Sequence, residues 1–196
     1  MKLRVLCMTV MSAAIILTGC SSNSQGDVQV LDGYELQPQY AGALDFAGND
    51  AVFTVRIVKA ESPQVGTISD SGGVRGTYVY TPITAVVTEV LKAGGESVTV
   101  GQTVTLRVAG GTTGGRTTVN KITAEPSDYA SGALVQIFSG KAFHDPESGQ
   151  TQYVPNWSFE VGSTTLTNLH DRKVQMSLGD ANNQAQEVAA WRGWQR

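Results

Sequence analysis

Residues 103–108, Thr-Val-Thr-Leu-Arg-Val, alternate polar and apolar side chains without a break. Successive side chains of a β-strand point to opposite faces, so this period of two predicts a half-buried strand. The side chains expected to face a core are those of Val104, Leu106 and Val108. The side chains expected to face outward are those of Thr103, Thr105 and Arg107. The sequence therefore predicts a sheet with a core on one face.

Strand-forming composition recurs on both sides of this stretch, between turns rich in glycine and proline. The further expected strands are 51–58, 77–91, 116–124, 133–138, 150–154, 158–161, 164–169 and 173–178. Pro82 lies inside the second strand-like run and predicts an edge position or a bulge there. Residues 61–76 and 110–115 are expected to be loops, and 145–149 a turn.

Only two segments have helical character. Residues 41–47 are expected to form a short helix before the first strand, and 182–191 a helix near the C-terminus, capped by Asp180 or Asn182. Many short strands with few helices predict an all-β fold, either a small Greek-key barrel or a sandwich. We expect residues 48–196 to form a single domain of this kind.

Composition and charge exclude several classes of protein. Charged residues make up 16% of the 196 residues, against a usual share of about 25%. This is too little charge for a coiled coil or a disordered acidic tail. The formal net charge of −3 repels phosphate, so no nucleic-acid partner is expected.

The N-terminus has the organisation of an export signal. Lys2 and Arg4 form a positive region, and residues 5–17 follow without a charge. Thirteen helical residues extend about 20 Å, which is too short for a hydrocarbon core of about 30 Å. The sequence therefore predicts a signal peptide over residues 1–19 rather than a transmembrane helix.

The end of this signal, Leu17-Thr18-Gly19-Cys20, resembles the lipobox of bacterial lipoproteins. The resemblance implies that Cys20 is acylated, with palmitate among its chains, and becomes the first residue of the mature protein. Residues 20–47 would then be anchor, tether and lead-in segment, and the protein would be held outside the cytoplasm at a bacterial membrane. A plain secretory signal with a chance cysteine is the alternative.

Loss of residues 1–19 also removes Cys7, Lys2 and Arg4, which changes the formal net charge from −3 to −5. Cys20 is the one cysteine left. The expected domain therefore has no disulfide and no cysteine metal ligand, and its stability must come from its hydrophobic core.

The body of the chain, over residues 48–163, resembles secreted bacterial domains with the barrel of TIMP and netrin modules, a variant of the OB-fold. The motifs are a valine-rich strand before lysine and glycine (86–94), a double glycine (110–111) and an apolar strand that ends in phenylalanine (132–138). The disulfides and N-terminal cysteine of true TIMP domains are missing. The chain therefore lacks the residues through which a TIMP domain would inhibit a metalloprotease.

The sequence contains no catalytic motif, and its candidate reactive groups are histidine and carboxylate side chains in two predicted loops. Its candidates are His144, Asp145, Glu147, His170 and Asp171. They would form a metal or acid–base site only if two loops met, because a zinc site usually needs three ligands on rigid elements. The expected interpretation is surface turns, with no catalytic residue, no metal and no cofactor.

Two further patterns favour structure over chemistry. Residues 110–117 match a phosphate-binding loop except that Arg116 replaces lysine, but the threonine-rich sequence that follows is a poor helix former. Trp157, Trp191 and Trp194 could line a sugar-binding face, although Trp191 is expected to pack its helix onto the sheet.

The sequence thus predicts a lipid-anchored cell-envelope protein with a non-catalytic binding or structural role. Its ligand is not identified, and a protein or a glycan partner fits the pattern. Two alternatives stay open. One is an envelope enzyme or metal-binding protein that uses the histidine loops. The other is a subunit of an envelope complex that contacts its partner through residues 191–194.

Overall fold

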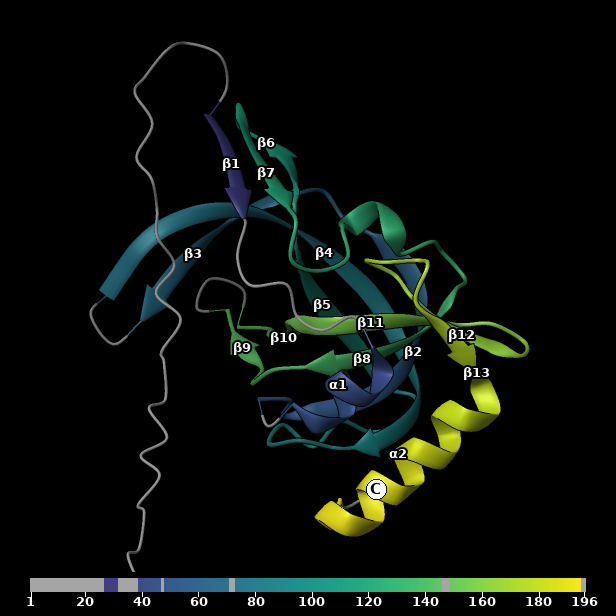
Figure 1. Cartoon of the computed structure of the whole chain (residues 1–196). Coiled ribbons are helices and arrows are strands. Elements are labelled where there is room, and N and C mark those ends of the chain that lie inside the picture. Colours follow the sequence, from purple (N-terminus) through teal and green to yellow (C-terminus); the bar gives the residue numbers. More distant parts are fainter. Residues whose placement is uncertain (1–26, 32–38, 47, 71–72, 146–148, 195–196) are drawn as a thin grey trace, which may run out of the picture.

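The computed structural model describes residues 27–31, 39–46, 48–70, 73–145 and 149–194. Figure 1 shows a strongly curved sheet, a smaller sheet at one end of it and two helices at the other. The strands are β1 (Asp27–Leu31), β2 (Ala51–Ala60), β3 (Gln64–Asp70), β4 (Gly73–Lys92), β5 (Thr103–Ala109), β6 (Gly111–Thr113), β7 (Arg116–Asn120), β8 (Leu134–Ser139), β9 (Phe143–His144), β10 (Thr151–Tyr153), β11 (Pro155–Val161), β12 (Thr165–Asn168) and β13 (Gln175–Ser177). The helices are α1 (Tyr40–Asp45) and α2 (Leu178–Arg192), and a 3₁₀ turn covers Pro126–Asp128.

The larger sheet is mixed. Its strand order is β13-β12-β11-β8-β2-β4-β5-β10-β9, and β3 pairs with β4 beside this path. The smaller sheet has the order β1-β7-β6. Within these two sheets β10 runs parallel to β5 and β1 runs parallel to β7, while the other pairs are antiparallel.

The stretch formed by β10 and β11 pairs with both outer strands of the central group β8-β2-β4-β5. β10 pairs with β5 through Gln152 and Tyr153, and after one intervening residue β11 begins and pairs with β8. The sheet therefore curls around a core, but it is not a closed barrel. The expectation of an all-β fold with a C-terminal helix is confirmed. Of the two architectures expected, the sandwich-like one fits.

The central strands have a core on each face. On β2, Phe53 and Val55 belong to the core inside the curl, while Val52 belongs to a second core beneath the helices. On β5, the expectation for the apolar side chains is confirmed: Val104, Leu106 and Val108 are all buried in the inner core.

Both helices cover the second core. Tyr40 of α1 contacts Phe138 and Phe159 edge to face, with ring centroids 5.5 and 5.3 Å apart. The buried face of α2 consists of Ala181, Ala185 and Ala189. Their spacing of four residues places them on one side of a helix, where a small side chain permits close approach to the sheet.

The start of α2 differs from the expected one. The helix begins four residues before Asn182, and its cap is Ser177, whose Oγ accepts the N–H of Asp180 at 3.1 Å. The hydroxyl also donates to the Asp180 carboxylate at 2.6 Å. Asp180 therefore supports the cap from inside the first turn, where its negative charge suits the helix dipole.

Two of the expected loops contain strands. The segment 61–76 holds β3 and the start of β4, which form the hairpin that extends to one side in Figure 1. The segment 110–115 holds β6. Glycine and proline in both segments resemble loop sequence, yet glycine is tolerated in a strand where another group approaches closely.

Pro82 occupies a junction between strands. Its carbonyl accepts the N–H of Glu61 at 2.8 Å. In a β-strand the nitrogen and the carbonyl of one residue point to the same neighbouring strand, so the Pro82 nitrogen also faces Glu61. On that side β2 has ended at Ala60 and β3 begins only at Gln64. The missing N–H therefore costs no ladder hydrogen bond, in agreement with the expected irregularity.

Candidate ligand-binding cleft

The histidine loops lie at opposite ends of the larger sheet. His144 is in β9 and His170 follows β12, and these strands stand at or near the two ends of the strand order. Glu147 lies outside the described residues. Within the described ranges, no group of three or more His, Cys, Asp and Glu side chains is placed to hold a metal ion.

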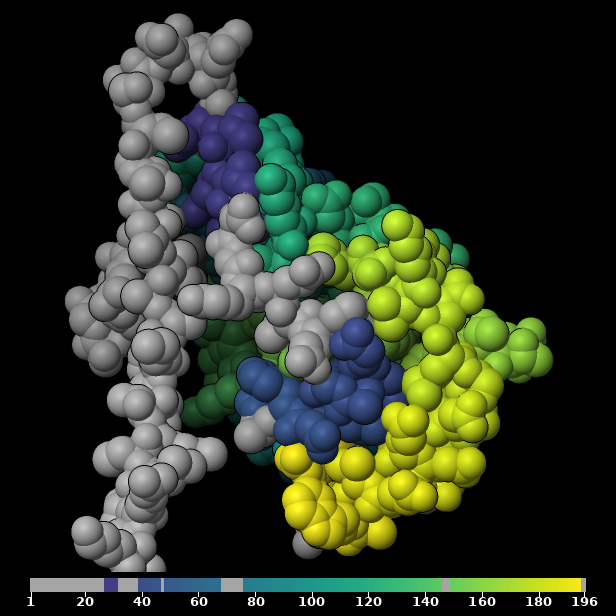
Figure 2. Space-filling view, viewed as in Figure 1, coloured from purple at the N-terminus to yellow at the C-terminus, as the bar shows by residue number. Residues whose placement is uncertain are grey.

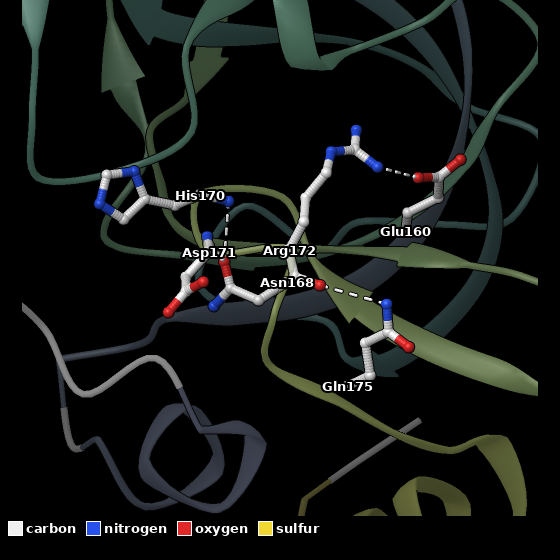
Figure 3. Close-up of polar contacts among 6 residues, drawn as sticks. All are labelled: Glu160, Asn168, His170, Asp171, Arg172 and Gln175. Atoms are coloured by element: carbon white, nitrogen blue, oxygen red, sulfur yellow. Dashed lines mark hydrogen bonds and ion pairs between the residues drawn. The ribbon is translucent and has the colours of Figure 1, made fainter.

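The residues around His170 form a turn held by one side chain. Asn168 Oδ1 accepts the N–H of His170 at 2.8 Å and that of Asp171 at 3.0 Å. The Asp171 carboxylate in turn accepts the N–H of Lys173 at 3.1 Å. Figure 3 shows Arg172 reaching Glu160 while the His170 ring projects elsewhere. These contacts give the polar residues a role in closing the β12–β13 connection.

The glycine-rich segment 110–117 forms part of a hairpin, and the expected acylation site lies outside the described residues. Residues 110–117 form part of the β6–β7 hairpin, and the chain continues from them as strand β7 rather than as a helix. Arg116 donates to Thr77 Oγ1 at 2.9 Å. Cys20, the expected acylation site, lies outside the described residues. No described helix is long and apolar enough to span a membrane.

The expectation for Trp191 is wrong. Its side chain is 80% exposed, and the helix packs through its alanines instead. Trp194 packs against the second core, and Trp157 is buried there with its ring 5.1 Å from that of Phe46. The C-terminal tryptophans therefore divide into one that contacts the fold and one that faces solvent.

A polar cleft opens at the end of the sheet that lies near α1 and the C-terminus of α2. Its volume is about 500 Å³, within the range of about 300–1,000 Å³ that is typical of ligand sites. We call it the charged cleft. Its lining consists of Gly48, Asn49, Asp50, Lys92, Gly95, Glu96 and Lys141.

The floor of the charged cleft is held by Asn49, which is 4% exposed. Its side-chain amide donates to the carbonyl of Ala43 at 2.6 Å, and its Oδ1 accepts from Asn156 at 3.1 Å. Its own carbonyl accepts from Lys92 Nζ at 2.6 Å. These bonds connect α1, β4 and β11 at one residue, so the cleft has a fixed base.

Asp50 connects the start of β2 to the turn after β4. Its Oδ2 accepts the N–H of Gly95 at 3.0 Å. Gly94 has φ of +74°, and a Cβ there would lie 2.9 Å from Asp50 Oδ2 and from Ala51 Cβ. Glycine is therefore required at position 94 for both the turn and the approach of the aspartate.

Charges of both signs meet in the charged cleft. Among the described residues, none of Lys92, Lys141, Asp50 and Glu96 has an ion pair within 4.0 Å. The negative charges of Glu96 and Asp50 also act on Tyr153, whose pKa is raised mainly by burial and further by these two carboxylates. Lys92 and Asp50 are already engaged by Asn49 and Gly95, whereas the Lys141 ammonium and the Glu96 carboxylate remain available to a ligand.

Two aromatic rings, those of Phe46 and Trp194, contact residues that line the charged cleft. The Phe46 ring lies directly over Gly48, and its side chain is 42% exposed. The Trp194 ring centroid is 5.8 Å from Lys92 Nζ, a cation–π contact. The cleft thus combines flat apolar surfaces with charged and amide groups.

A second polar cluster surrounds Arg107 on the opposite face of β5 from the inner core. The guanidinium donates to the Tyr78 hydroxyl at 2.6 Å and to Gln152 Oε1 at 2.8 Å. Its Cζ lies 3.7 Å from the Tyr80 ring centroid and 4.3 Å from that of Phe143. We call these five residues the Arg107 cluster.

Arg107 was expected to face solvent, and this expectation is wrong. It does lie on the face opposite Leu106, but it is only 4% exposed. Within the described part of the chain no carboxylate lies within 4.0 Å of it. Its charge is stabilised by aromatic rings and neutral acceptors instead, and Gly66 leaves room for the guanidinium because any Cβ there would collide with it.

Neither cluster was found in the sequence. Gly94 and Gly95 have the sequence of an ordinary turn, and Asp50, which accepts the N–H of Gly95, lies 45 residues away. A polar pair that opens a strand, such as Asn49-Asp50, resembles an ordinary turn.

No protein-family model matches the chain, and a search of curated proteins found no match.

Proposed function

We propose that this protein is a lipid-anchored, non-catalytic binding protein of the bacterial cell envelope, and that its ligand binds in the charged cleft. The observation that carries the proposal is the coexistence, in one cleft of about 500 Å³, of two lysines and two carboxylates that form no ion pairs with the described residues. Unpaired charges beside flat apolar surfaces are the features that fix and orient a polar ligand.

The anchor is supported by the N-terminal sequence. The positive residues, the short apolar run and Leu17-Thr18-Gly19-Cys20 together have the composition of a lipoprotein signal. Two or three acyl chains, at about 0.8 kcal/mol for each buried CH₂, hold a protein stably on a membrane. The polar residues after Cys20 would carry the domain away from the membrane surface.

The proposed relationship to the OB-fold group is supported by the strand pairing. β2 pairs with β4 and β8, β4 pairs with β5, and the β10–β11 stretch joins β5 in parallel and β8 in antiparallel fashion. An OB-fold is a five-stranded, partly open Greek-key barrel whose members bind oligonucleotides and oligosaccharides. The formal charge of −5 for the expected mature chain disfavours the nucleic acid.

The proposal is tested by thermal melting of the purified full chain with a panel of small charged compounds, amino acids, short peptides and oligosaccharides. A ligand that binds only the folded state raises the melting temperature by mass action. We expect one class to raise it for the wild type and for Lys121→Gln, a matched exposed lysine outside the cleft. The rise should be reduced in Lys141→Gln and Asp50→Asn. A rise of equal size in all four proteins, or none with any class, contradicts the proposal.

A further inference from the structure

We infer that the charged cleft accepts an acidic saccharide, that is, a short sugar chain that carries a carboxylate. The inference rests on the proposed function, because it names the ligand class of the same cleft. Three features of the cleft support it: its aromatic flanks, its unpaired charges and the elements from which its walls are built.

The aromatic flanks suit pyranose rings. One face of a pyranose presents C–H groups, which lie favourably against the electron-rich face of an aromatic ring. Phe46 is held in place by its edge-to-face contact with Trp157 at 5.1 Å, yet 42% of it is exposed. Trp194 is held by the second core and by Lys92. Phe46 therefore offers exposed apolar surface without having to be ordered on binding, and Trp194 is fixed in place beside Lys92.

The unpaired charges suit the substituents of an acidic sugar. Lys141 is exposed, and among the described residues it has no ion pair, so its ammonium can form a charge-assisted hydrogen bond with a ligand carboxylate. The carboxylates of Asp50 and Glu96 can accept from hydroxyl or amide groups of the sugar. Two lysines and two carboxylates line the cleft, so its total formal charge is neutral and a ligand with one carboxylate is not repelled.

The walls of the charged cleft favour a saccharide over an extended peptide. A peptide commonly binds by adding a strand to an open sheet edge, where backbone groups supply most of its hydrogen bonds. The lining residues of this cleft come instead from the segment before β2, the end of β4, the turn after it and the residues after β8. These segments present side chains to the cleft.

The test is calorimetry of the full chain in detergent micelles with three probes. The first is a disaccharide of two N-acetylated amino sugars, one with a lactyl carboxylate. The second is the same disaccharide without that carboxylate, and the third is a short acidic peptide. We expect one site that binds the acidic disaccharide most tightly, the neutral disaccharide less tightly and the peptide not measurably.

Two substitutions separate the contributions. Lys141→Gln should weaken binding of the acidic disaccharide about tenfold, which is 1.4 kcal/mol, and leave the neutral disaccharide unchanged. Phe46→Ala should weaken both disaccharides, with circular dichroism used to show that this variant still melts cooperatively. Lys121→Gln should change neither affinity.

The outcomes distinguish this inference from the proposed function. If the peptide binds and neither disaccharide does, the saccharide inference is wrong while the charged cleft remains a ligand site. If the acidic disaccharide binds equally well to wild type, Lys141→Gln and Phe46→Ala, its site is elsewhere and the inference is wrong. If neither these probes nor the wider panel affects the protein, both proposals are wrong.

Discussion

At the scale of single residues, Arg107 is the buried charge that most constrains the fold. Removing a guanidinium from water is costly unless its donors and its charge are compensated. Here two hydrogen bonds and two closely stacked rings supply the compensation, and they come from β4, β9 and β10. Arg107 therefore ties the β3–β4 hairpin and the β9–β10 region to β5.

We predict that Arg107→Lys lowers the free energy of unfolding by about 2 kcal/mol or more. A lysine keeps the positive charge, but its ammonium is not planar and cannot stack on the Tyr80 and Phe143 rings. It also cannot donate to the Tyr78 hydroxyl and Gln152 Oε1 in the geometry of the guanidinium. Hydrogen bonds to a charged group are worth about 1.5–3 kcal/mol each. Urea unfolding measures the change, and Thr103→Ala, an exposed position on the same strand, should cost less than about 0.5 kcal/mol. Equal effects of the two substitutions would refute this role of Arg107.

At the scale of elements, the sequence predicted what depends on local pattern. The alternation at 103–108 correctly placed Val104, Leu106 and Val108 in the core, because a period of two fixes which side chains share a face. Arg107 was misplaced because its burial depends on Phe143 and Gln152, which lie far along the chain. Periodicity assigns a residue to a face, but it carries no information about what covers that face.

The β3 hairpin illustrates the same limit. Its segment contains Pro63 and Gly66, which favour a loop. Gly66 is present because the Arg107 guanidinium occupies the space of a side chain. Similarly, the charged cleft joins Asp50 to Gly95 and Asn49 to Asn156. These contacts arise only after the sheet has curled, so no local signal in the sequence reveals them.

The cap of α2 supplies a prediction at this scale. Ser177→Ala removes the acceptor for the Asp180 N–H and should lower stability by about 1 kcal/mol, within a usual range of about 0.5–2 kcal/mol. Amide hydrogen exchange should show the loss of protection mainly in the first turn of α2. Asn183→Ala, an exposed position inside the helix, serves as the control and should leave that protection unchanged. Protection that is the same in Ser177→Ala and wild type would contradict the assigned cap.

At the scale of the whole molecule, a curled sheet carries a core on each face, and the charged cleft lies at the end near the helices. Figure 2 shows α2 and the neighbouring segments forming one end of the molecule, while β1 lies at the other. The described domain needs no disulfide, since its cores are built from apolar side chains of β2, β4, β5, β8 and β11.

We predict that Cys20→Ala moves the protein from the membrane to the soluble fraction of lysed cells. The lipobox resemblance implies that the Cys20 thiol is acylated. The acyl chains are the proposed means of membrane attachment, so their loss should release the domain from the bilayer. The intact mass of the wild-type protein should show acyl groups on a chain that begins at residue 20. A variant that stays as membrane-bound as the wild type, or a wild-type mass without acyl groups, would contradict the anchor.

The proposed ligand site is the charged cleft, and amide chemical-shift mapping can locate a bound ligand residue by residue. Gly95 is a reporter inside the cleft, since its N–H donates to Asp50, and Gly66 is a reporter beside the Arg107 cluster. The labelled full chain is titrated with the soluble glycan and peptide fragments of a digested cell wall. We predict saturable shifts at Gly95 and Lys141 and none at Gly66. Shifts at Gly66 and Phe143 with none at Gly95, or no shift at any amide, would contradict it.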